Sequence, residues 1–431
     1  MVESSDKKTG QSIGWIYSVL PINMALGPVG TYVQLYILEL HGTVIDIGLA
    51  TTLFNAVSIP AAMIWGFATD RIRKRRTIVI ASYLAVTMTL ISFLLAKTIY
   101  GIEVLYAIFS LVSSASATPL NLLVMETQPK SRWAPAFARF SMITSIGVTL
   151  GLLLGVAWAD YLPVHLIVVP LGVLSVVSAI ISFAMIREPS ITFEREVILM
   201  VKRSFYERLL VVPMLFLNIP RLIDFRLVFK GIKYELTRDP TIIYLSIFAF
   251  YLASGIFNTS LVPSLYRANV SKSQVFLVSL VGMIIQVIAF NSLGRRMERR
   301  GLKETAVQGL VLRGLSYAAI GIAVFFLTGF WYLGINLIFY PLAAGIAYAA
   351  YYAASNVMVF NTLGRANQGS TLGVYSAIVG FATMLGSFVS GFISFFLGFY
   401  VTFIVAAIWL GIGAALTSVL SPTIESRMDS P

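Results

Sequence analysis

Two long apolar runs in this sequence are separated by a short, strongly charged segment, Asp70–Arg76. The segment holds one carboxylate and five cationic side chains within seven residues. A charge at the centre of a bilayer costs several kcal/mol, so the segment is predicted to be an aqueous turn between two membrane-spanning helices. Since Lys and Arg are enriched in cytoplasmic loops, the turn is predicted to lie on the cytoplasmic side.

The composition supports a membrane protein. Hydrophobic residues make up 58% and charged residues 12% of the chain, against about 45–50% and 25% in soluble domains. The net charge of +12 would suggest nucleic acid in a soluble protein, but the predicted cytoplasmic loops account for it, and we expect no nucleic-acid partner. Cysteine is absent, which excludes disulfides and thiolate metal sites.

Twelve runs are apolar over about the 20 residues that a helix needs to cross a bilayer. They are Ile13–Leu38, Val44–Ala68, Thr77–Ala96, Ile102–Met125, Ala134–Trp158 and Pro163–Ile186, then Thr241–Pro263, Ser273–Leu293, Glu304–Leu327, Trp331–Phe360, Gly369–Phe395 and Phe399–Leu420. Because only helices satisfy every backbone group of such runs in lipid, we predict an all-α membrane protein with twelve transmembrane helices in two pseudo-symmetric six-helix bundles. Of the 31 Lys and Arg residues, those at 97, 267 and 272 fall in loops on the predicted outer side, which places both termini in the cytoplasm.

These spans divide the chain into five parts. A cytoplasmic tail (1–12) precedes the first bundle (13–186), and a second tail (421–431) follows the second bundle (241–420). The linker between the bundles (187–240) carries ten Lys or Arg and seven Asp or Glu, with apolar residues at roughly helical spacing. Its longest apolar piece is too short to span, so we predict helices lying on the cytoplasmic surface of the cell membrane.

The two halves contain an internal repeat at an offset of 235 residues. The matching pairs are Asn121–Thr127 with Asn356–Thr362, Ser141 with Ser376, and Gly151 with Gly386. The fourth and fifth spans thus match the tenth and eleventh. Repeated six-helix halves are typical of transporters, in which the substrate binds between halves that rock against each other.

The pattern Gly66-x-x-x-Asp70-Arg71 followed by a basic run, between the second and third of twelve spans, resembles the loop motif of the Major Facilitator Superfamily. The resemblance extends over nearly the whole chain through the topology, the linker and the duplicated halves. Arg73 stands where the family has glycine, so the turn does not depend on a glycine conformation.

The resemblance implies a cytoplasmic gate. In the family the aspartate and arginine of the motif hold the halves together, and the aspartate faces the start of the eleventh span, which places Asp70 near Gln368–Thr371. A carboxylate is stabilised at a helix N-terminus by roughly 0.3–1 kcal/mol. Glu126 and Arg132 resemble the companion charges of this gate. The alternative is that these residues, Gly66 and Arg71 included, only determine topology.

The fifth span carries Gly147, Gly151 and Gly155 at intervals of four. This series is similar to a motif of the family's efflux antiporters, although Leu152 replaces its proline and Val156 its last glycine. Close helix packing is the alternative explanation of small residues at this spacing.

Charged side chains are missing from the middle of the first, fourth, seventh and tenth spans, which the resemblance implies line the cavity. Coupling to a proton or ion gradient is therefore left open. Arg139 and Arg313 are predicted to reach the cytoplasmic interface, with a role as partner of a substrate anion as the alternative. Asp46 is expected to cap the helix that begins at Val44.

The predicted substrate-binding residues are polar or aromatic side chains on the four cavity spans. They are Asn23, Gln34, Ser113, Ser114, Asn121, Asn258, Thr259, Tyr348, Tyr351, Tyr352 and Asn356. Tyr348 and Tyr352 are one turn apart and share a helix face. Hydrogen bonds between helices are the alternative role for each of them. Uncharged hydroxyls and amides among aromatic rings favour a neutral or amphipathic organic substrate.

We therefore predict a secondary active or facilitative transporter that moves a small organic solute across the bilayer by alternating access, with efflux of amphipathic compounds favoured. The alternatives are an uptake permease for a neutral metabolite such as a sugar, and a membrane receptor or assembly subunit that does not transport. Clusters of His, Asp, Glu or Cys at mid-membrane are absent from the sequence, so we expect no enzyme activity, catalytic residue, metal or cofactor. We expect a monomer.

Overall fold

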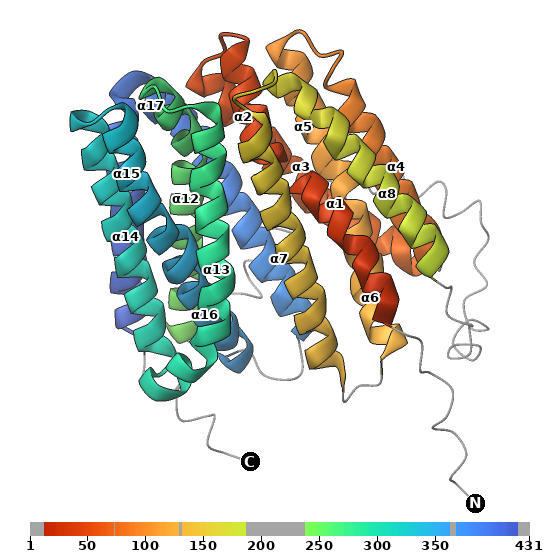
Figure 1. Cartoon of the computed structure of the whole chain (residues 1–431). Coiled ribbons are helices and arrows are strands. Elements are labelled where there is room, and N and C mark those ends of the chain that lie inside the picture. Colours follow the sequence, from red (N-terminus) through yellow and green to blue (C-terminus); the bar gives the residue numbers. More distant parts are fainter. Residues whose placement is uncertain (1–12, 73, 129–131, 187–237, 363–367, 421–431) are drawn as a thin grey trace, which may run out of the picture.

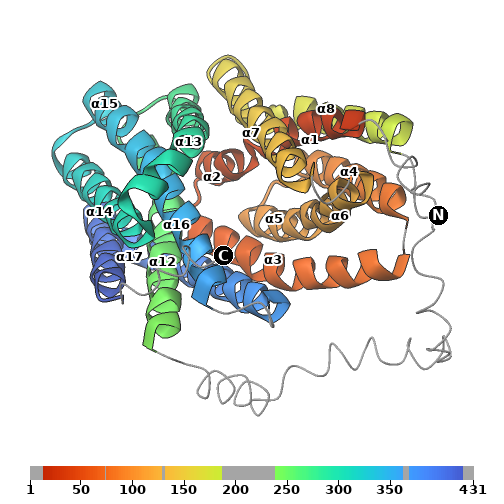
Figure 2. The same cartoon turned by 90° about the horizontal axis from the view of Figure 1, so that it is seen from below.

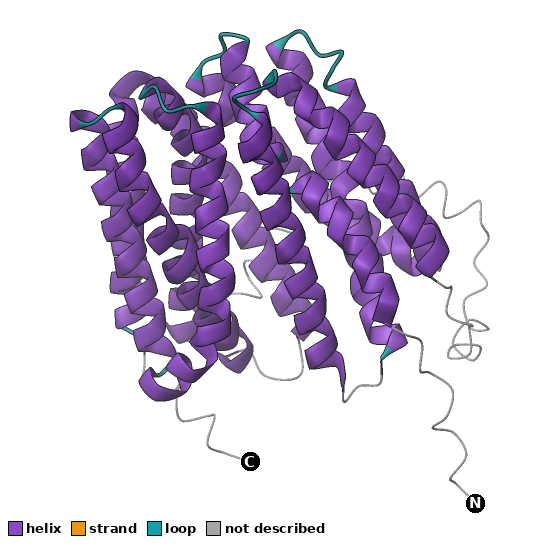
Figure 3. Ribbon diagram, in the orientation of Figure 1, coloured by secondary structure: helices purple, strands orange, loops and turns teal. Residues whose placement is uncertain are grey.

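The computed structural model describes residues 13–72, 74–128, 132–186, 238–362 and 368–420. Every regular element in these ranges is a helix, and most run roughly parallel to one common direction (Figures 1 and 3). Both predicted tails and the linker up to residue 237 lie outside the described residues, so the surface helices of the linker stay a prediction.

The first bundle holds η1 (Ile13–Ser18), α1 (Val19–Leu26), α2 (Val29–Glu39), α3 (Val44–Ile72), α4 (Arg75–Ser92), α5 (Ile99–Ser113), η2 (Ser114–Ser116), α6 (Ala117–Thr127), α7 (Trp133–Trp158), η4 (Val164–Ile167) and α8 (Val168–Met185). The second holds α12 (Arg238–Arg267), α13 (Lys272–Arg300), α14 (Leu302–Phe326), α15 (Gly329–Tyr340), η6 (Pro341–Ala347), α16 (Tyr348–Thr362) and α17 (Gln368–Ser418). Seen from below, the two bundles lie side by side (Figure 2).

The predicted twelve spans are confirmed. Within the described residues, nine helical stretches are long and apolar enough to cross a membrane. Three further spans bring this number to twelve. The first is broken into η1, α1 and α2; the third is α4, whose 18 residues include Arg75 and Arg76; and α17 holds two spans that meet at Gly398, where φ is 85°.

The bundles meet mainly along two pairs of helices, α3 with α17 and α7 with α13. We name the two ends of the molecule after residues there. The Glu39 end is where α2 ends and α13 begins, at the top of Figure 1. The Arg75 end is where α4 begins and α6 ends, at the bottom.

The glycines of the internal repeat make equivalent helix contacts in the two bundles. A Cβ on Gly151 would lie 2.2 Å from the carbonyl oxygen of Met24, and one on Gly386 would lie 2.3 Å from that of Leu252. In each bundle the glycine thus lets two helix backbones touch, α7 against α1 and α17 against α12. α6 and α16 also end at Thr127 and Thr362, 235 residues apart.

The other two glycines of the α7 series also serve close packing. A Cβ on Gly147 would lie 2.7 Å from the carbonyl oxygen of Leu20, and one on Gly155 would lie 2.6 Å from the ring of Phe276 on α13. The packing explanation of the series is therefore confirmed. Gly155 differs from the others, because its contact joins the two bundles.

Three of the predicted cavity spans are interrupted near their middle. The first is interrupted at Gly27 and Pro28, between α1 and α2. The fourth tightens into η2, where the Ser114 hydroxyl donates to the Ser110 carbonyl at 2.7 Å. The tenth widens into η6, a π-helical turn that begins at Pro341, whose nitrogen has no hydrogen to donate. Interrupted spans often border transport sites, where irregular backbone lines a cavity.

Asp46 caps α3, as predicted. Its carboxylate accepts hydrogen bonds from the backbone nitrogen of Thr43 at 2.6 Å and from the Thr43 hydroxyl at 2.8 Å. The Thr43 hydroxyl accepts a longer one in return from the Asp46 nitrogen, at 3.4 Å. Asp46 thereby stabilises the start of a helix.

Candidate functional site

A cavity of about 260 Å³ lies between the two bundles. Its lining is Gly27, Gly30, Thr31, Gln34 and Leu152 from the first bundle, and Asn258, Leu261, Val262, Ser279, Gly282, Met283, Gln286, Tyr340 and Ala344 from the second. Because each bundle builds one wall, any movement of the bundles against each other changes the shape of this cavity.

The cavity wall is mixed in character. Three amide side chains face it, from Gln34 on α2, Asn258 on α12 and Gln286 on α13. The Oε1 atom of Gln34 is buried and has no hydrogen-bond partner among the described residues. A buried acceptor without a partner costs about 1–3 kcal/mol, so a ligand with a donor group would bind there favourably. The remaining wall combines aliphatic side chains with glycines, two hydroxyls, Met283 and Tyr340.

Glycines shape this wall. A Cβ on Gly282 would lie 2.5 Å from the ring of Tyr340, so the glycine makes room for that ring beside the cavity. A Cβ on Gly27 would lie 2.8 Å from the carbonyl oxygen of Val148, so the bend in the first span is packed directly against α7. Larger residues at either position would require the cavity helices to move apart.

Two of the predicted substrate-binding residues, Gln34 and Asn258, line the cavity. Thr259 is buried, and its hydroxyl has no partner among the described residues. Asn121 is exposed near the middle of α6. Four others donate to carbonyls of their own helices; they are Asn23, Ser113, Ser114 and Asn356. Their role in binding stays a prediction.

The three predicted tyrosines lie on α16, away from this cavity. Tyr348 and Tyr352 stack with ring centroids 5.7 Å apart, and Tyr352 is 38% exposed. Tyr351 points into the bundle instead, where its hydroxyl lies 2.9 Å from that of Ser246 and its ring 4.2 Å from that of Phe250. The tyrosines therefore form a second polar region, distinct from the cavity.

Sequence reasoning missed the contribution of α13. Ser279 and Gln286 lie seven residues apart, which is two helical turns, so they share one face of the apolar middle of this helix (275–290). That spacing is a readable signal. The family resemblance implies binding residues on the first, fourth, seventh and tenth spans, whereas α13 is the eighth.

The prediction that Arg313 reaches the membrane interface is wrong. Arg313 follows the start of α14 by eleven residues, about 16 Å along the helix, and it is 2% exposed. Its guanidinium carbon lies 4.4 Å from the ring centroid of Phe250, inside the second bundle. Arg139 on α7, in contrast, is exposed.

Polar contacts join the two bundles at the Glu39 end. Lys272 on α13 forms an ion pair with Glu39 on α2. The Asp160 carboxylate accepts hydrogen bonds from the Ser271 hydroxyl at 2.9 Å and from the Ser273 backbone nitrogen at 3.0 Å. Asp160 therefore lies at the N-terminus of α13, where the helix dipole stabilises a negative charge.

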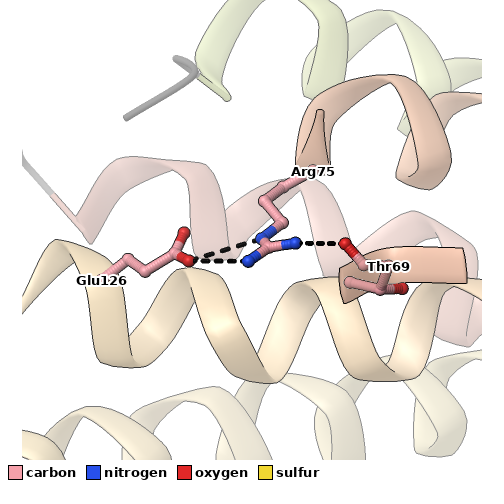
Figure 4. A network of polar contacts seen from close by, with 3 residues as sticks. All are labelled: Thr69, Arg75 and Glu126. Atoms are coloured by element: carbon pink, nitrogen blue, oxygen red, sulfur yellow. Dashed lines mark hydrogen bonds and ion pairs between the residues drawn. The ribbon is translucent and has the colours of Figure 1, made fainter. Parts of the chain in front are cut away.

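The ion pair at the Arg75 end stays inside the first bundle. Arg75 lies 3.1 Å from Glu126 on α6, and it also donates to the carbonyl of Thr69 at the end of α3 (Figure 4). The predicted companion Arg132 is exposed, and a Cβ on Gly66 would meet nothing within 4 Å.

The side chains of Asp70 and Arg71 and those of residues 368–374 lie outside the described part of the structure. The predicted contact between Asp70 and the start of α17 therefore stays a prediction.

The chain resembles solved transporter structures along almost its entire length. A nucleoside transporter matches with a TM-score of 0.67 at 13% identity, over 95% of this chain and 99% of that one. A peptide transporter in complex with alafosfalin matches with a TM-score of 0.72 at 13% identity, over 97% and 95% of the two chains. A bacterial homologue of the human lysosomal transporter Spinster, in an inward-facing and unoccupied conformation, matches with a TM-score of 0.69 at 16% identity, over 97% of each chain.

At these identities the likeness establishes the fold. Among curated proteins, none matches the chain by sequence at a significant level. The sequence profile described as Major Facilitator Superfamily matches residues 7–230 and 243–430, which leaves out only the first six residues, a short stretch at the end of the linker (231–242) and the last residue. The chain is a member of the Major Facilitator Superfamily and a multi-pass membrane transporter.

Proposed function

We propose that this transporter moves a small amphipathic organic solute by alternating access, and that the solute binds in the cavity between the bundles. The observation that carries the proposal is the mixed wall of that cavity, with Gln34 from one bundle and Asn258 from the other facing a space bordered by aliphatic side chains. Amide groups on both bundles give a bound solute contacts that change as the bundles move.

The proposed direction is export from the cytoplasm, with the Arg75 end on the cytoplasmic side. The basic loop at that end supports the orientation, and the glycine series of α7 resembles that of the family's efflux antiporters, although packing also accounts for it. The cytoplasmic gate of this proposal consists of Gly66, Asp70, Arg71, Glu126 and Arg132. Import of a neutral metabolite such as a sugar is the second candidate, since the cavity holds amides and hydroxyls without a formal charge.

The test is transport by purified protein in proteoliposomes, with a panel of labelled solutes and with or without an imposed pH gradient. We expect saturable movement of at least one amphipathic solute. Movement that does not respond to the gradient would identify a facilitator, and accumulation driven by the gradient would identify proton coupling. If no solute of the panel moves, the result would contradict this proposal and favour the alternative of a receptor or assembly subunit.

Substitutions in the cavity wall test whether transport of the solute depends on this cavity. Gln34→Ala and Asn258→Ala should each reduce transport about tenfold, since a hydrogen bond to the solute contributes roughly 1–1.5 kcal/mol. Asn291→Ala is the matched control, because Asn291 is an exposed amide on α13 outside the cavity lining. Normal transport by both cavity variants, at equal amounts in the membrane, would rule out this binding site.

A further inference from the structure

Arg313 is a buried cation without an anionic partner in the part of the chain that the structure describes. Its Nε donates to the Tyr317 hydroxyl at 2.8 Å, while its Nη1 is buried and has no partner among the described residues. Neither of the two ion pairs among those residues includes it. Guanidinium stays protonated at any physiological pH, so the interior of the second bundle carries a full positive charge.

The sequence offers no carboxylate close to this charge within the second bundle. From residue 238, where α12 begins, to residue 420 the acids are Asp239, Glu298 and Glu304. Asp239 lies in the first turn of α12 and precedes Phe250 by eleven residues, about 16 Å along the axis. Glu298 belongs to the last turn of α13, and Glu304 precedes Arg313 by nine residues on α14, about 14 Å along the axis.

Aromatic rings take the place of a counter-ion. The guanidinium carbon lies 4.4 Å from the ring centroid of Phe250 and 5.3 Å from those of Tyr317 and Tyr348. Cation–π contacts stabilise a desolvated guanidinium, but they leave Nη1 unsatisfied. Removing a cation from water without a charged partner is unfavourable. The site therefore lowers its free energy when an anion approaches.

Two series of ring contacts lead from Arg313, one to the exposed Tyr352 and the other to the cavity wall. Tyr348 touches the guanidinium and also stacks on Tyr352, which is partly exposed. On the other side, Tyr317 stacks on Phe257 at 3.7 Å, and Phe257 lies 6.3 Å from Tyr340 of the cavity wall. The cation thus lies between Tyr340 of the cavity wall and the separate tyrosine region of α16, and aromatic rings connect it to both.

We propose that Arg313 is the anchor of a subsite for the anionic group of the transported solute, so that the substrate class is an amphipathic organic monoanion. Tyr348 moves aside to admit the anion, and the rings around the guanidinium hold the apolar body of the solute. This inference rests on the proposed transport function, and it assigns the charge of the substrate that the cavity lining alone leaves open.

The first experiment measures binding without transport. The midpoint of thermal unfolding of the purified protein in detergent is followed with benzoate or phenyl phosphate, and with benzamide as the neutral counterpart of benzoate. At least one anion should raise the midpoint more than benzamide does. In Arg313→Gln that anion should bind at least tenfold more weakly, whereas Arg313→Lys should retain part of the effect. Arg139→Gln is the matched control and should bind as the wild type does.

The stability of the ligand-free Arg313→Gln variant separates a binding role from a structural one. Removing a buried charge without a counter-ion should raise its melting temperature above that of the wild type. A lower melting temperature together with unchanged anion binding would assign Arg313 to packing and overturn the proposal. If Arg313→Gln does not fold, Tyr348→Ala replaces it, with the expectation of altered anion affinity; unaltered affinity would overturn the proposal.

Transport distinguishes this inference from the proposed function. Anion binding that depends on Arg313, without movement of any solute in proteoliposomes, would support the subsite and contradict transport. Movement of neutral solutes only, unchanged in Arg313→Gln and not inhibited by either anion, would contradict the subsite and leave transport standing.

Discussion

The two ends of the interface between the bundles can be compared by one kind of contact, a carboxylate of the first bundle at a helix N-terminus of the second. At the Glu39 end, the carboxylate of Asp160 from the first bundle meets the N-terminus of α13 from the second. At the Arg75 end, Asp70 is predicted to meet the N-terminus of α17. The described ion pair at that end, between Arg75 and Glu126, stays within one bundle.

This difference suggests how the transporter switches. A carboxylate of the first bundle at a helix N-terminus of the second is a contact of about 0.3–1 kcal/mol, weak enough to break at each cycle. The structure has this contact formed at the Glu39 end. A pair of such contacts, formed alternately at the two ends, would keep the two access states close in free energy, which alternating access requires.

The largest effect is expected from linking the bundles at the Glu39 end. The chain has no cysteine, so Glu39→Cys with Lys272→Cys provides the sole reactive pair for a short bifunctional methanethiosulfonate. Because these positions belong to different bundles, the cross-link should abolish transport, and a reducing agent should restore it. Transport is measured in proteoliposomes before and after reduction.

The matched control is the same reaction at the other end, in Arg75→Cys with Glu126→Cys. Both positions belong to the first bundle, so this cross-link should leave transport at the level of the unlinked double variant. Equal inhibition by the two cross-links would contradict the distinction between the ends.

The fold was readable from the sequence because each span is specified by its own apolar run, whatever it packs against. The repeat was readable for a related reason, since Gly151 and Gly386 serve the same backbone contact in each bundle. The site was only partly readable. Gln34 and Asn258 were found through the resemblance, while Gln286 was missed with the rest of α13.

Arg313 shows what sequence reasoning could not supply. Its position along α14 was known, but the direction in which a helix presents a side chain depends on its neighbours. Here the rings of Phe250 and Tyr348 contact the guanidinium, so the side chain points into the second bundle. A single sequence gives the depth of a residue in the membrane more readily than the side of the helix that faces the bundle.

A smaller effect is expected when the contacts at the Glu39 end are weakened. Glu39→Gln with Asp160→Asn removes one partly exposed ion pair and one carboxylate at a helix N-terminus, together worth about 0.5–2 kcal/mol. The population open at this end should rise between about twofold and thirtyfold. The measurement is the rate at which Ser279→Cys, on the cavity wall, reacts with an impermeant maleimide outside whole cells. Glu304→Gln, at an exposed acid in the first turn of α14, is the control, and an equal change in that variant would refute the assignment.

The smallest effect is expected from Asp70→Asn. If Asp70 meets the N-terminus of α17 only when the Arg75 end closes, the change should disfavour that state by about 0.3–1 kcal/mol, which is between about twofold and fivefold in population. Labelling of Ser279→Cys from outside should therefore slow, opposite in sign to the change caused by Glu39→Gln with Asp160→Asn, and transport should fall at an unchanged amount of protein in the membrane. Combining all three substitutions should return the labelling rate toward that of Ser279→Cys alone, because each end would have lost its carboxylate contact. A labelling rate that Asp70→Asn does not alter, with normal transport, would reduce the basic loop to a determinant of topology and leave the Glu39 end as the side that controls access.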